Sequence, residues 1–420
     1  MRYFSVILLI IALLVNGCSQ RERMNPLDPH NPDTQGAPSG MSIFSNRDSV
    51  FIRWNPVDIN NMVEYAIYRS QGETDLEKII GLAPEFSDYL DLQVEYDRSY
   101  RYALQIETDY DLSAFSDTLE IVPGPYNLWV ADFHGFSVSR ISYDGSHRMA
   151  IQSFPAPIAF AFLTGQNLGF VANYWDKQIS VIDQNINILR NIPLNDSPVD
   201  MQIDPQNERI LVLLREQNSL SEYGFTGELR KTTELNIDVT GHLQFAYDPV
   251  SSSIWYLDLW TDSLRVSSSV YTANLMSMAN SLIHAETIES DPLFGGCWVP
   301  AQNGLHYFSI NDPPRIYKPG YHILDISLNP ENGDCYFVAQ SNTDGSWQTG
   351  RLRGRDGYQE EILLENGYEK LYSIQAIPGS DKRGFLVFQG DNWKLLRFDA
   401  EENLIGELGY FDIRLDTAIE

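Results

Sequence analysis

One pattern of hydrophobic and polar positions recurs along roughly the last 300 residues of the chain. Each copy has a short apolar run typical of a buried strand, then a turn rich in Asn, Asp and Gly, and a second strand that closes a hairpin. The apolar runs are 127–132, 167–173, 209–214, 253–258, 304–309, 334–339 and 384–388. Copies at a spacing of roughly 30 to 50 residues predict a radial or stacked array of small antiparallel sheets.

A further strand and a proline turn precede most of these runs. The extra strands cover 157–162, 198–203, 242–247, 322–328 and 371–377. Several end in an Asp-Pro or Asn-Pro turn, as at Asp204, Asp248 and Asn329. This order of strand, proline turn, apolar strand and Asn/Asp-rich turn resembles the NHL and YVTN types of β-propeller repeat over residues 125–420. The resemblance implies blades around a central channel.

The two ends of the repeat region supply one complete blade between them. The first apolar run has no strand before it, and an alternating segment at 410–418 is left over at the other end. Pairing the two would close the ring and cover an exposed strand edge. We therefore expect a seven-bladed propeller closed by the C-terminal strand. The fifth blade, near 294–320, is abbreviated, so six blades are the alternative if a neighbouring blade absorbs it. The fourth blade carries an insertion at 267–292.

Residues 37–124 show the two-residue alternation of half-buried strands. The alternating runs are 49–54, 65–69 and 100–106. Their order around Trp54 and Tyr100 resembles a fibronectin type III domain along its whole length. The resemblance implies a β-sandwich with Trp54 in the core and Tyr100 in a tyrosine corner. We expect an all-β protein in which this domain is a spacer, with a ligand site of its own as the alternative.

The first residues have the pattern of an export signal. Arg2 is followed by an apolar run, 6–15, that is too short to span a bilayer. The run ends in Gly17-Cys18, which resembles the lipobox of bacterial lipoproteins. The resemblance implies that residues 1–17 are a removable signal peptide and that Cys18 carries the lipid. An ordinary signal peptide with an incidental cysteine is the alternative.

A proline-rich segment, 18–36, separates Cys18 from the first domain. It has little to bury and is predicted to be a tether. Ser19 follows the cysteine, and in enterobacterial lipoproteins a residue other than Asp at this position favours the outer membrane. We therefore expect a protein of the bacterial cell envelope, held at the outer membrane by its N-terminal lipid. Its orientation, periplasmic or outward-facing, stays open.

Charge and cysteine content narrow the choice of partners. The 57 acidic and 29 basic residues give a net charge of −28, which repels phosphate backbones and makes nucleic acid an unexpected partner. Cys297 and Cys335 lack the spacing of a zinc or redox motif, and no calcium loop is present. We therefore expect neither a metal nor a cofactor. The two cysteines could form a disulfide or remain buried thiols.

Local catalytic motifs are absent from the sequence. There is no Gly-x-Ser-x-Gly, His-Glu-x-x-His, phosphate-binding loop or dinucleotide fingerprint. We therefore do not expect an enzyme. The alternative is a hydrolase or lyase in the propeller channel, because propeller enzymes of this kind gather single residues from many blades.

The turns between the second and third strands of a propeller's blades gather on one face. Here they place tryptophans beside carboxylates, a combination that suits sugar rings, peptides or cationic groups. The predicted ligand-binding residues are Asp132, His134, Trp175, Asp176, Trp260, Asp262, Trp347, Asp391 and Trp393. The sequence thus favours a lipid-anchored binding protein or scaffold that recognises a protein, peptide or glycan. In the simpler alternative, Asp and Asn only form turns and the tryptophans cover blade edges.

Replacement of Cys18 by Ser tests the lipid anchor. We expect the Cys18→Ser variant either to move into the soluble fraction or to accumulate as unprocessed precursor, because the lipid can no longer be attached. Membrane fractionation and mass spectrometry of the N-terminus measure both. Normal processing with unchanged membrane attachment would contradict the prediction.

Overall fold

The computed structural model divides the chain into two compact units, Met1–Pro125 and Tyr126–Glu420. It describes residues 27–31, 35–45, 47–59, 61–145, 148–163, 166–239, 242–269, 275–279, 282–354, 357–365, 370–378, 384–390, 394–399, 401, 403–409 and 415–419. The predicted signal peptide and Cys18 lie outside these ranges. No helix in the described part of the chain has the length and apolar character needed to cross a bilayer.

The N-terminal unit is a sandwich of two antiparallel sheets. One sheet has the order β1 (Ser42–Ser45), β2 (Val50–Arg53), β5 (Asp88–Asp91), and the other has the order β4 (Glu77–Leu82), β3 (Met62–Gln71), β6 (Tyr100–Thr108), β7 (Leu119–Ile121). The core forms between them because alternate residues of both sheets point inward, as Ile43 and Ile52 do on one side and Ile67 and Leu104 on the other.

The two aromatic residues singled out by the sequence lie in this core. Trp54 is 4% exposed, and its ring centroid lies 5.1 Å from that of Tyr65. The hydroxyl of Tyr100 accepts a hydrogen bond of 2.9 Å from the backbone N–H of Glu95, five residues upstream. This is the geometry of a tyrosine corner, which ties the start of β6 to the connection before it.

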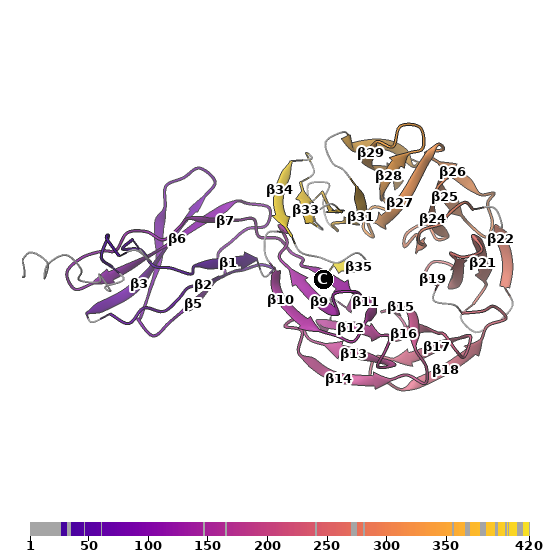
Figure 1. The fold of residues 1–420 in the computed structure, drawn as a ribbon, viewed down its shortest axis with the longest axis horizontal. Helices are drawn as coiled ribbons and strands as arrows, with labels where there is room; N and C mark the ends of the chain where they lie inside the picture. Colours follow the sequence, from indigo (N-terminus) through magenta and orange to yellow (C-terminus); the bar gives the residue numbers. More distant parts are fainter. Residues whose placement is uncertain are drawn as a thin grey trace, which may run out of the picture. The chain divides into compact units, whose positions relative to one another are not determined.

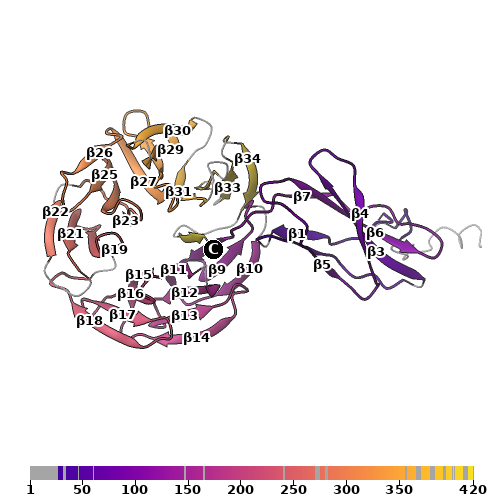
Figure 2. The same cartoon turned by 180° about the vertical axis from the view of Figure 1, so that it is seen from behind.

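The C-terminal unit is a ring of seven four-stranded antiparallel sheets (Figures 1 and 2). The first four blades, each from its innermost to its outermost strand, are β35 (Leu415–Ile419), β8 (Leu128–Asp132), β9 (Ser137–Ile141), β10 (Arg148–Ser153); β11 (Pro157–Leu163), β12 (Leu168–Asn173), β13 (Gln178–Ile182), β14 (Ile188–Pro193); β15 (Pro198–Asp204), β16 (Arg209–Leu214), β17 (Ser219–Gly224), β18 (Leu229–Glu234); and β19 (Leu243–Asp248), β20 (Ser253–Asp258), β21 (Ser263–Ser267), β22 (Leu275–Ala279). The last three blades are β23 (Glu289–Ser290), β24 (Cys297–Ala301), β25 (Gly304–Phe308), β26 (Arg315–Tyr317); β27 (Tyr321–Leu328), β28 (Cys335–Ser341), β29 (Trp347–Arg353), β30 (Gln359–Glu365); and β31 (Leu371–Ala376), β32 (Phe385–Gln389), β33 (Lys394–Phe398), β34 (Leu404–Leu408). The predicted all-β fold, a sandwich followed by a seven-bladed propeller, is confirmed.

The first blade combines strands from both ends of this unit. β35 pairs antiparallel with β8, and Thr417 lies opposite Val130 in the register. Figure 1 shows β35, in yellow, beside the inner strands of the ring. The pairing covers the edge of β8 and completes four strands in the blade.

The fifth blade differs from its sequence prediction. The repeat pattern predicts that residues 304–309 form the second strand of the blade, but Gly304–Phe308 is the third strand. The second strand is Cys297–Ala301, and it contains Pro300, which has no backbone N–H to donate and so masks the strand pattern. The predicted insertion at 267–292 in turn contains β22, the outermost strand of blade four, and β23.

Neighbouring blades pack on one another through apolar side chains. Phe170 and Val181 of the second blade share a buried cluster with Met201 and Val212 of the third. Equivalent clusters occur around the ring. Each such side chain contributes about 1.5–3 kcal/mol through burial, so the blade interfaces form the core of the propeller.

Aspartate and asparagine fix the turn that follows several innermost strands. Asp204, Asp248, Asp291 and Asn329 each accept a hydrogen bond from the backbone N–H two residues on, at 2.8 to 3.2 Å. A proline follows each of them in the sequence. These residues therefore form Asx turns that end one strand and begin the next.

Polar side chains also cap the free edges of innermost strands. The inner edge of such a strand has no further strand to bond, so its N–H groups need other partners. Asp200 accepts from Phe245 N at 3.0 Å, and Asp325 accepts from Ile374 N at 2.9 Å. In each case the side chain belongs to one blade and the N–H to the innermost strand of the next.

Cys297 and Cys335 are free, buried thiols. Burial raises the pKa of both thiols well above its usual value, so neither is poised as a thiolate nucleophile.

Removal of residues 410–420 tests how far ring closure stabilises the propeller. The loss of β35 exposes the edge of β8, and a cost of about 2 kcal/mol lowers the melting temperature of a unit of this size by about 3 °C. Differential scanning calorimetry measures the change. A synthetic 410–420 peptide added in trans should restore the melting temperature, and the same peptide with Thr417→Pro, which breaks the pairing, should not. A truncated protein that melts like the parent would refute the prediction.

Candidate functional site

Two kinds of connection meet at one end of the blades. They are the turns between second and third strands and the segments that lead into the innermost strands, and we call this end the upper face. Backbone hydrogen bonds join them, as from Tyr174 N to Ala156 O at 3.0 Å and from Arg215 N to Ser197 O at 3.1 Å. The opposite end, where the chain leaves the innermost strands through the Asx turns, is the lower face.

Trp175 lies on the upper face beside a second aromatic ring. Its side chain is 60% exposed, and its ring centroid lies 5.0 Å from that of Phe136, which is 39% exposed. Phe136 belongs to the corresponding turn of the first blade, so the pair bridges two blades. Exposed neighbouring rings of this kind offer a flat apolar surface for stacking.

Trp260 forms a separate aromatic site on the same face. It is 78% exposed, and its ring centroid lies 5.5 Å from that of His242. Trp260 lies in blade four and Trp175 in blade two, so the turn of the third blade separates them in the ring. The structure thus places both tryptophans on one face without joining them in a single cluster.

Trp347, Asp391 and Trp393 complete the predicted aromatic and acidic set. Trp347 is the first residue of β29 rather than a turn residue, and it packs partly buried against the core cluster that contains Tyr336 and Leu371. It therefore covers a blade interface, as the simpler alternative predicts. Asp391 and Trp393 lie outside the described residues.

The predicted acidic residues differ in their surroundings. Asp132 is buried and accepts a hydrogen bond of 2.7 Å from Gly135 N within its own turn. Asp262 accepts from His284 N at 3.2 Å and from Ala285 N at 2.9 Å. Asp176 and His134 are exposed. Asp132 therefore stabilises its own turn, and Asp262 ties its turn to the segment that leads into the fifth blade. Asp176 and His134 lie open to solvent.

Sequence reasoning missed one buried carboxylate of the upper face. Asp196 is 1% exposed and accepts hydrogen bonds from Gln217 N at 3.0 Å and from Glu216 N. The ammonium of Lys177 lies 3.7 Å from its carboxylate. Asp196 thus ties the segment leading into the third blade to the turn of that blade. Its partners are about twenty residues away, so no local motif could show it.

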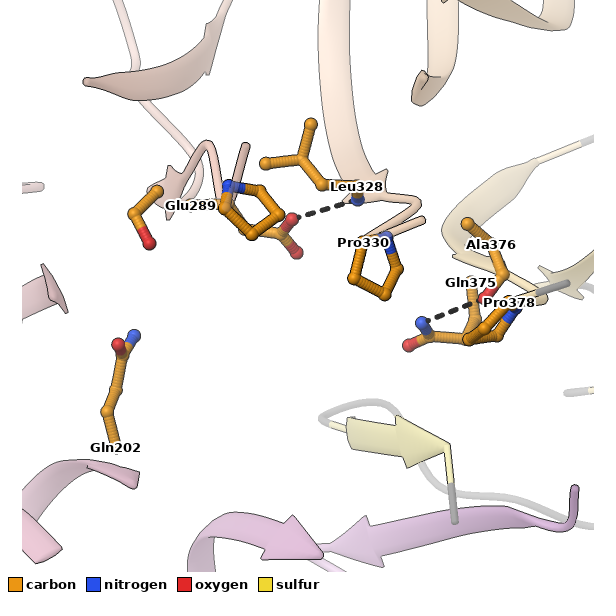
Figure 3. A pocket seen from close by; sticks show the side chains of 9 residues that line it. Gln202, Glu289, Leu328, Pro330, Gln375, Ala376 and Pro378 are labelled. Carbon is orange, nitrogen blue, oxygen red and sulfur yellow. Dashed lines mark hydrogen bonds between the residues drawn. The ribbon is translucent and has the colours of Figure 1, made fainter. Parts of the chain in front are cut away.

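A cavity of about 400 Å³ opens on the lower face (Figure 3). It takes its walls from the innermost strands of four blades and from the turns that follow them. Its lining residues are Gln202, Glu289, Ser290, Pro292, Leu328, Pro330, Gln375, Ala376 and Pro378. Among the described residues no group of three or more His, Cys, Asp or Glu side chains could hold a metal ion.

Comparison with known proteins supports the fold alone. No family model matches the chain, and no curated protein matches it. A functionally unknown protein from Desulfotomaculum acetoxidans is similar in structure, with a TM-score of 0.54 and 12% identity over 70% of this chain and 98% of that one. Two proteins described as a "putative 6-phosphogluconolactonase" are also similar. The one from Bacteroides uniformis has a TM-score of 0.51 and 8% identity over 70% of this chain and 99% of its own. The one from Bacteroides fragilis has a TM-score of 0.50 and 11% identity over 70% of this chain and 98% of its own.

Substitution of Asp262 tests whether its carboxylate has a structural role in tying two segments together rather than a role in ligand binding. Asp262 has a positive φ of 51°, which Asn tolerates better than Ala, and it accepts two backbone hydrogen bonds. We expect Asp262→Ala to destabilise the propeller by about 1–3 kcal/mol and Asp262→Asn by less, with Asp176→Ala, an exposed control, within about 0.5 kcal/mol of the parent. Urea unfolding measures the three variants. Equal stability of all three variants would contradict the structural role of Asp262.

Proposed function

We propose that this chain is a lipid-anchored protein of the bacterial envelope whose propeller binds a protein, peptide or glycan through its upper face. The observation that carries the proposal is the exposure of Trp175 and Trp260, each beside a second ring, on the same face of the ring of blades. An indole left in water forgoes the burial free energy that a large aromatic side chain otherwise gains. Exposed aromatic groups in turns held rigidly by a scaffold are typical of binding surfaces.

The chemistry of the upper face suits flat or extended ligands. Indole faces stack on the apolar faces of sugar rings and on peptide side chains, and they attract cationic groups. Asp176 adds an exposed carboxylate next to Trp175. The net charge of −28 adds a general preference for neutral or basic partners.

The N-terminal unit is proposed to be a stalk with a fibronectin type III fold. Its two sheets, its buried Trp54 and the hydrogen bond from Glu95 N to the hydroxyl of Tyr100 support that assignment. Together with the proline-rich tether and a lipid on Cys18, it would hold the propeller away from the membrane surface.

A binding role is preferred to catalysis in the channel because channel carboxylates already have structural partners. Asp200 and Asp325 accept hydrogen bonds from backbone N–H groups of the next blade. Likeness in fold to proteins described as lactonases supplies no catalytic residue to this chain. A hydrolase or lyase therefore has no observation of its own in its favour.

A double substitution of Trp175 and Trp260 by Ala tests the proposed function. Purified protein is immobilised, exposed to a detergent extract of the native envelope and to peptide and glycan arrays, and the affinity for each captured ligand is measured. Because aromatic anchors supply the largest losses on truncation, we expect the double variant to bind about thirtyfold more weakly or worse. The melting temperature should stay unchanged.

Tyr110, which is 85% exposed on the N-terminal unit, provides a matched control. Tyr110→Ala should bind like the parent. The proposal fails if the tryptophan variant keeps full affinity for every ligand, or if Tyr110→Ala weakens binding to the same extent.

A further inference from the structure

The N-terminal unit exposes large apolar side chains at one end of its sandwich. We propose that this end docks on the surface of a zwitterionic lipid bilayer. The side chains lie in the β4–β5 and β6–β7 connections or at the start of β3, and we call them the apolar pole: Val63 (45% exposed), Phe86 (48%), Tyr110 (85%) and Leu112 (51%). The proposal rests on the lipid anchor of the proposed function and adds a membrane contact made by the folded unit itself.

Backbone hydrogen bonds hold the connections of the apolar pole together. Trp54 N donates to Ser87 O at 3.1 Å, which joins the β2–β3 connection to the β4–β5 connection. Asp109 N donates to Asn61 O at 3.1 Å, which joins the β6–β7 connection to the β2–β3 connection. The four side chains are therefore carried to one end of the sandwich on a shared backbone framework. Exposed apolar groups gathered in this way mark an interaction surface, whereas single scattered ones do not.

The chain enters the unit at this end and leaves it at the other. Ala114 N, in the β6–β7 connection, donates to Gly36 O at 3.1 Å. Leu27 lies close by, since a Cβ on Gly36 would come within 3.3 Å of Leu27 O. At the opposite end, Asp97 N in the β5–β6 connection donates to Pro123 O at 2.9 Å, just before the unit ends. The N-terminal lipid is therefore attached through the end that carries the apolar pole.

The length of the tether limits how far this end can move from the membrane. Nine steps of chain separate Cys18 from Leu27, which packs against the core of the unit. At no more than about 3.6 Å per residue, these steps reach about 32 Å. A lipid on Cys18 thus confines the apolar pole to a thin layer next to the bilayer. Confinement of this kind raises the effective concentration of lipid at the pole, so a weak affinity is enough to dock it.

The side chains of the apolar pole suit the interfacial region of a bilayer. Tyr110 carries an apolar ring and a polar hydroxyl, and such amphipathic rings are enriched at the level of the lipid headgroups in membrane proteins. Val63, Phe86 and Leu112 gain free energy in proportion to the apolar area that they remove from water. A surface of this composition lies at the interface without crossing the bilayer.

The charge around the apolar pole favours neutral headgroups. The β2–β3, β4–β5 and β6–β7 connections contain no Lys or Arg in the sequence. Their exposed acidic residues are Asp58, Glu85, Asp109, Asp111 and Asp117. These carboxylates repel anionic lipid, so phosphatidylcholine and phosphatidylethanolamine are better surfaces than phosphatidylglycerol. A basic protein would also be attracted, but the anchor brings lipid to the pole and brings no protein.

A spin-label depth measurement on the lipidated chain, in vesicles of phosphatidylcholine, tests the docking. One label is placed at Tyr110→Cys, and a control label is placed at Glu73→Cys, an exposed position in the β3–β4 connection at the opposite end. The native Cys297 and Cys335 are buried, so the label reacts with the introduced thiols. We expect the ratio of collisions with dissolved oxygen to collisions with a water-soluble nickel chelate to be several-fold higher at Tyr110→Cys. Addition of phosphatidylglycerol at low salt should lower that ratio, and added salt should restore it.

Truncation of the apolar pole locates the contact. Phe86→Ala combined with Leu112→Ala removes two of its four side chains, and the ratio of docked to undocked protein, read from the label at Tyr110→Cys, should fall about tenfold or more. Leu92→Ala is the control, because Leu92 is 66% exposed in the β5–β6 connection at the opposite end. It should leave docking within about twofold of the parent. Both variants should melt like the parent, because the truncated side chains are exposed.

Mass spectrometry of the N-terminus separates this proposal from the anchor on which it rests. A chain without lipid on Cys18 overturns the anchor and the docking together. A lipidated chain in which the labels at Tyr110→Cys and Glu73→Cys are equally accessible to the nickel chelate overturns the docking alone. So does a double Ala variant that docks like the parent. Docking that requires added envelope protein assigns the pole to a protein partner and likewise overturns the proposal.

Discussion

The free edge of each innermost strand is the constraint on which this propeller depends. A four-stranded blade leaves its first strand with N–H and C=O groups that face the channel and find no further strand, and an unpaired buried backbone group costs free energy comparable to a lost hydrogen bond. Asp200, Glu289 and Asp325 meet this need by bonding to the innermost strand of the following blade. Gln202 bonds to both Phe245 O and Tyr247 N in the same way. These side chains fix the spacing between blades at the centre, while the apolar clusters fix it further out.

Much of the fold follows from patterns that lie within a few residues of one another. Apolar runs and Asp-Pro turns give the strands, and the turns form through contacts two residues apart, as at Asp204. The fifth blade was harder to predict because Pro300 interrupts its second strand and its innermost strand has two residues. The capping contacts and the lower cavity could not be predicted, since Asp200 and its partner Phe245 lie in different blades and share no motif.

The candidate upper-face residues show the limit of arguing from repeat position. Trp175 and Trp347 both lie between the second strand of a blade and the body of its third strand. Trp175 is nevertheless 60% exposed, whereas Trp347 packs into a blade interface. The difference arises because Trp347 begins a strand, where successive side chains point to opposite faces, whereas Trp175 sits in the turn itself. Aspartate is equally ambiguous, because the carboxylate that could hold a ligand is also a strong turn former, as Asp132 shows.

The pairing of β35 with β8 joins a strand made early in synthesis to one made after all the other blades. A blade such as β11 to β14 contains only local contacts and can form as soon as its own residues have emerged. The first blade is completed last, so β8 presents an unpaired edge until the C-terminal strand has been translated. The pairing of β35 with β8 is then a late, long-range step, and its entropic cost is that of closing a loop as long as the whole unit. During this interval the edge of β8 is open to aggregation and accessible to chaperones and proteases.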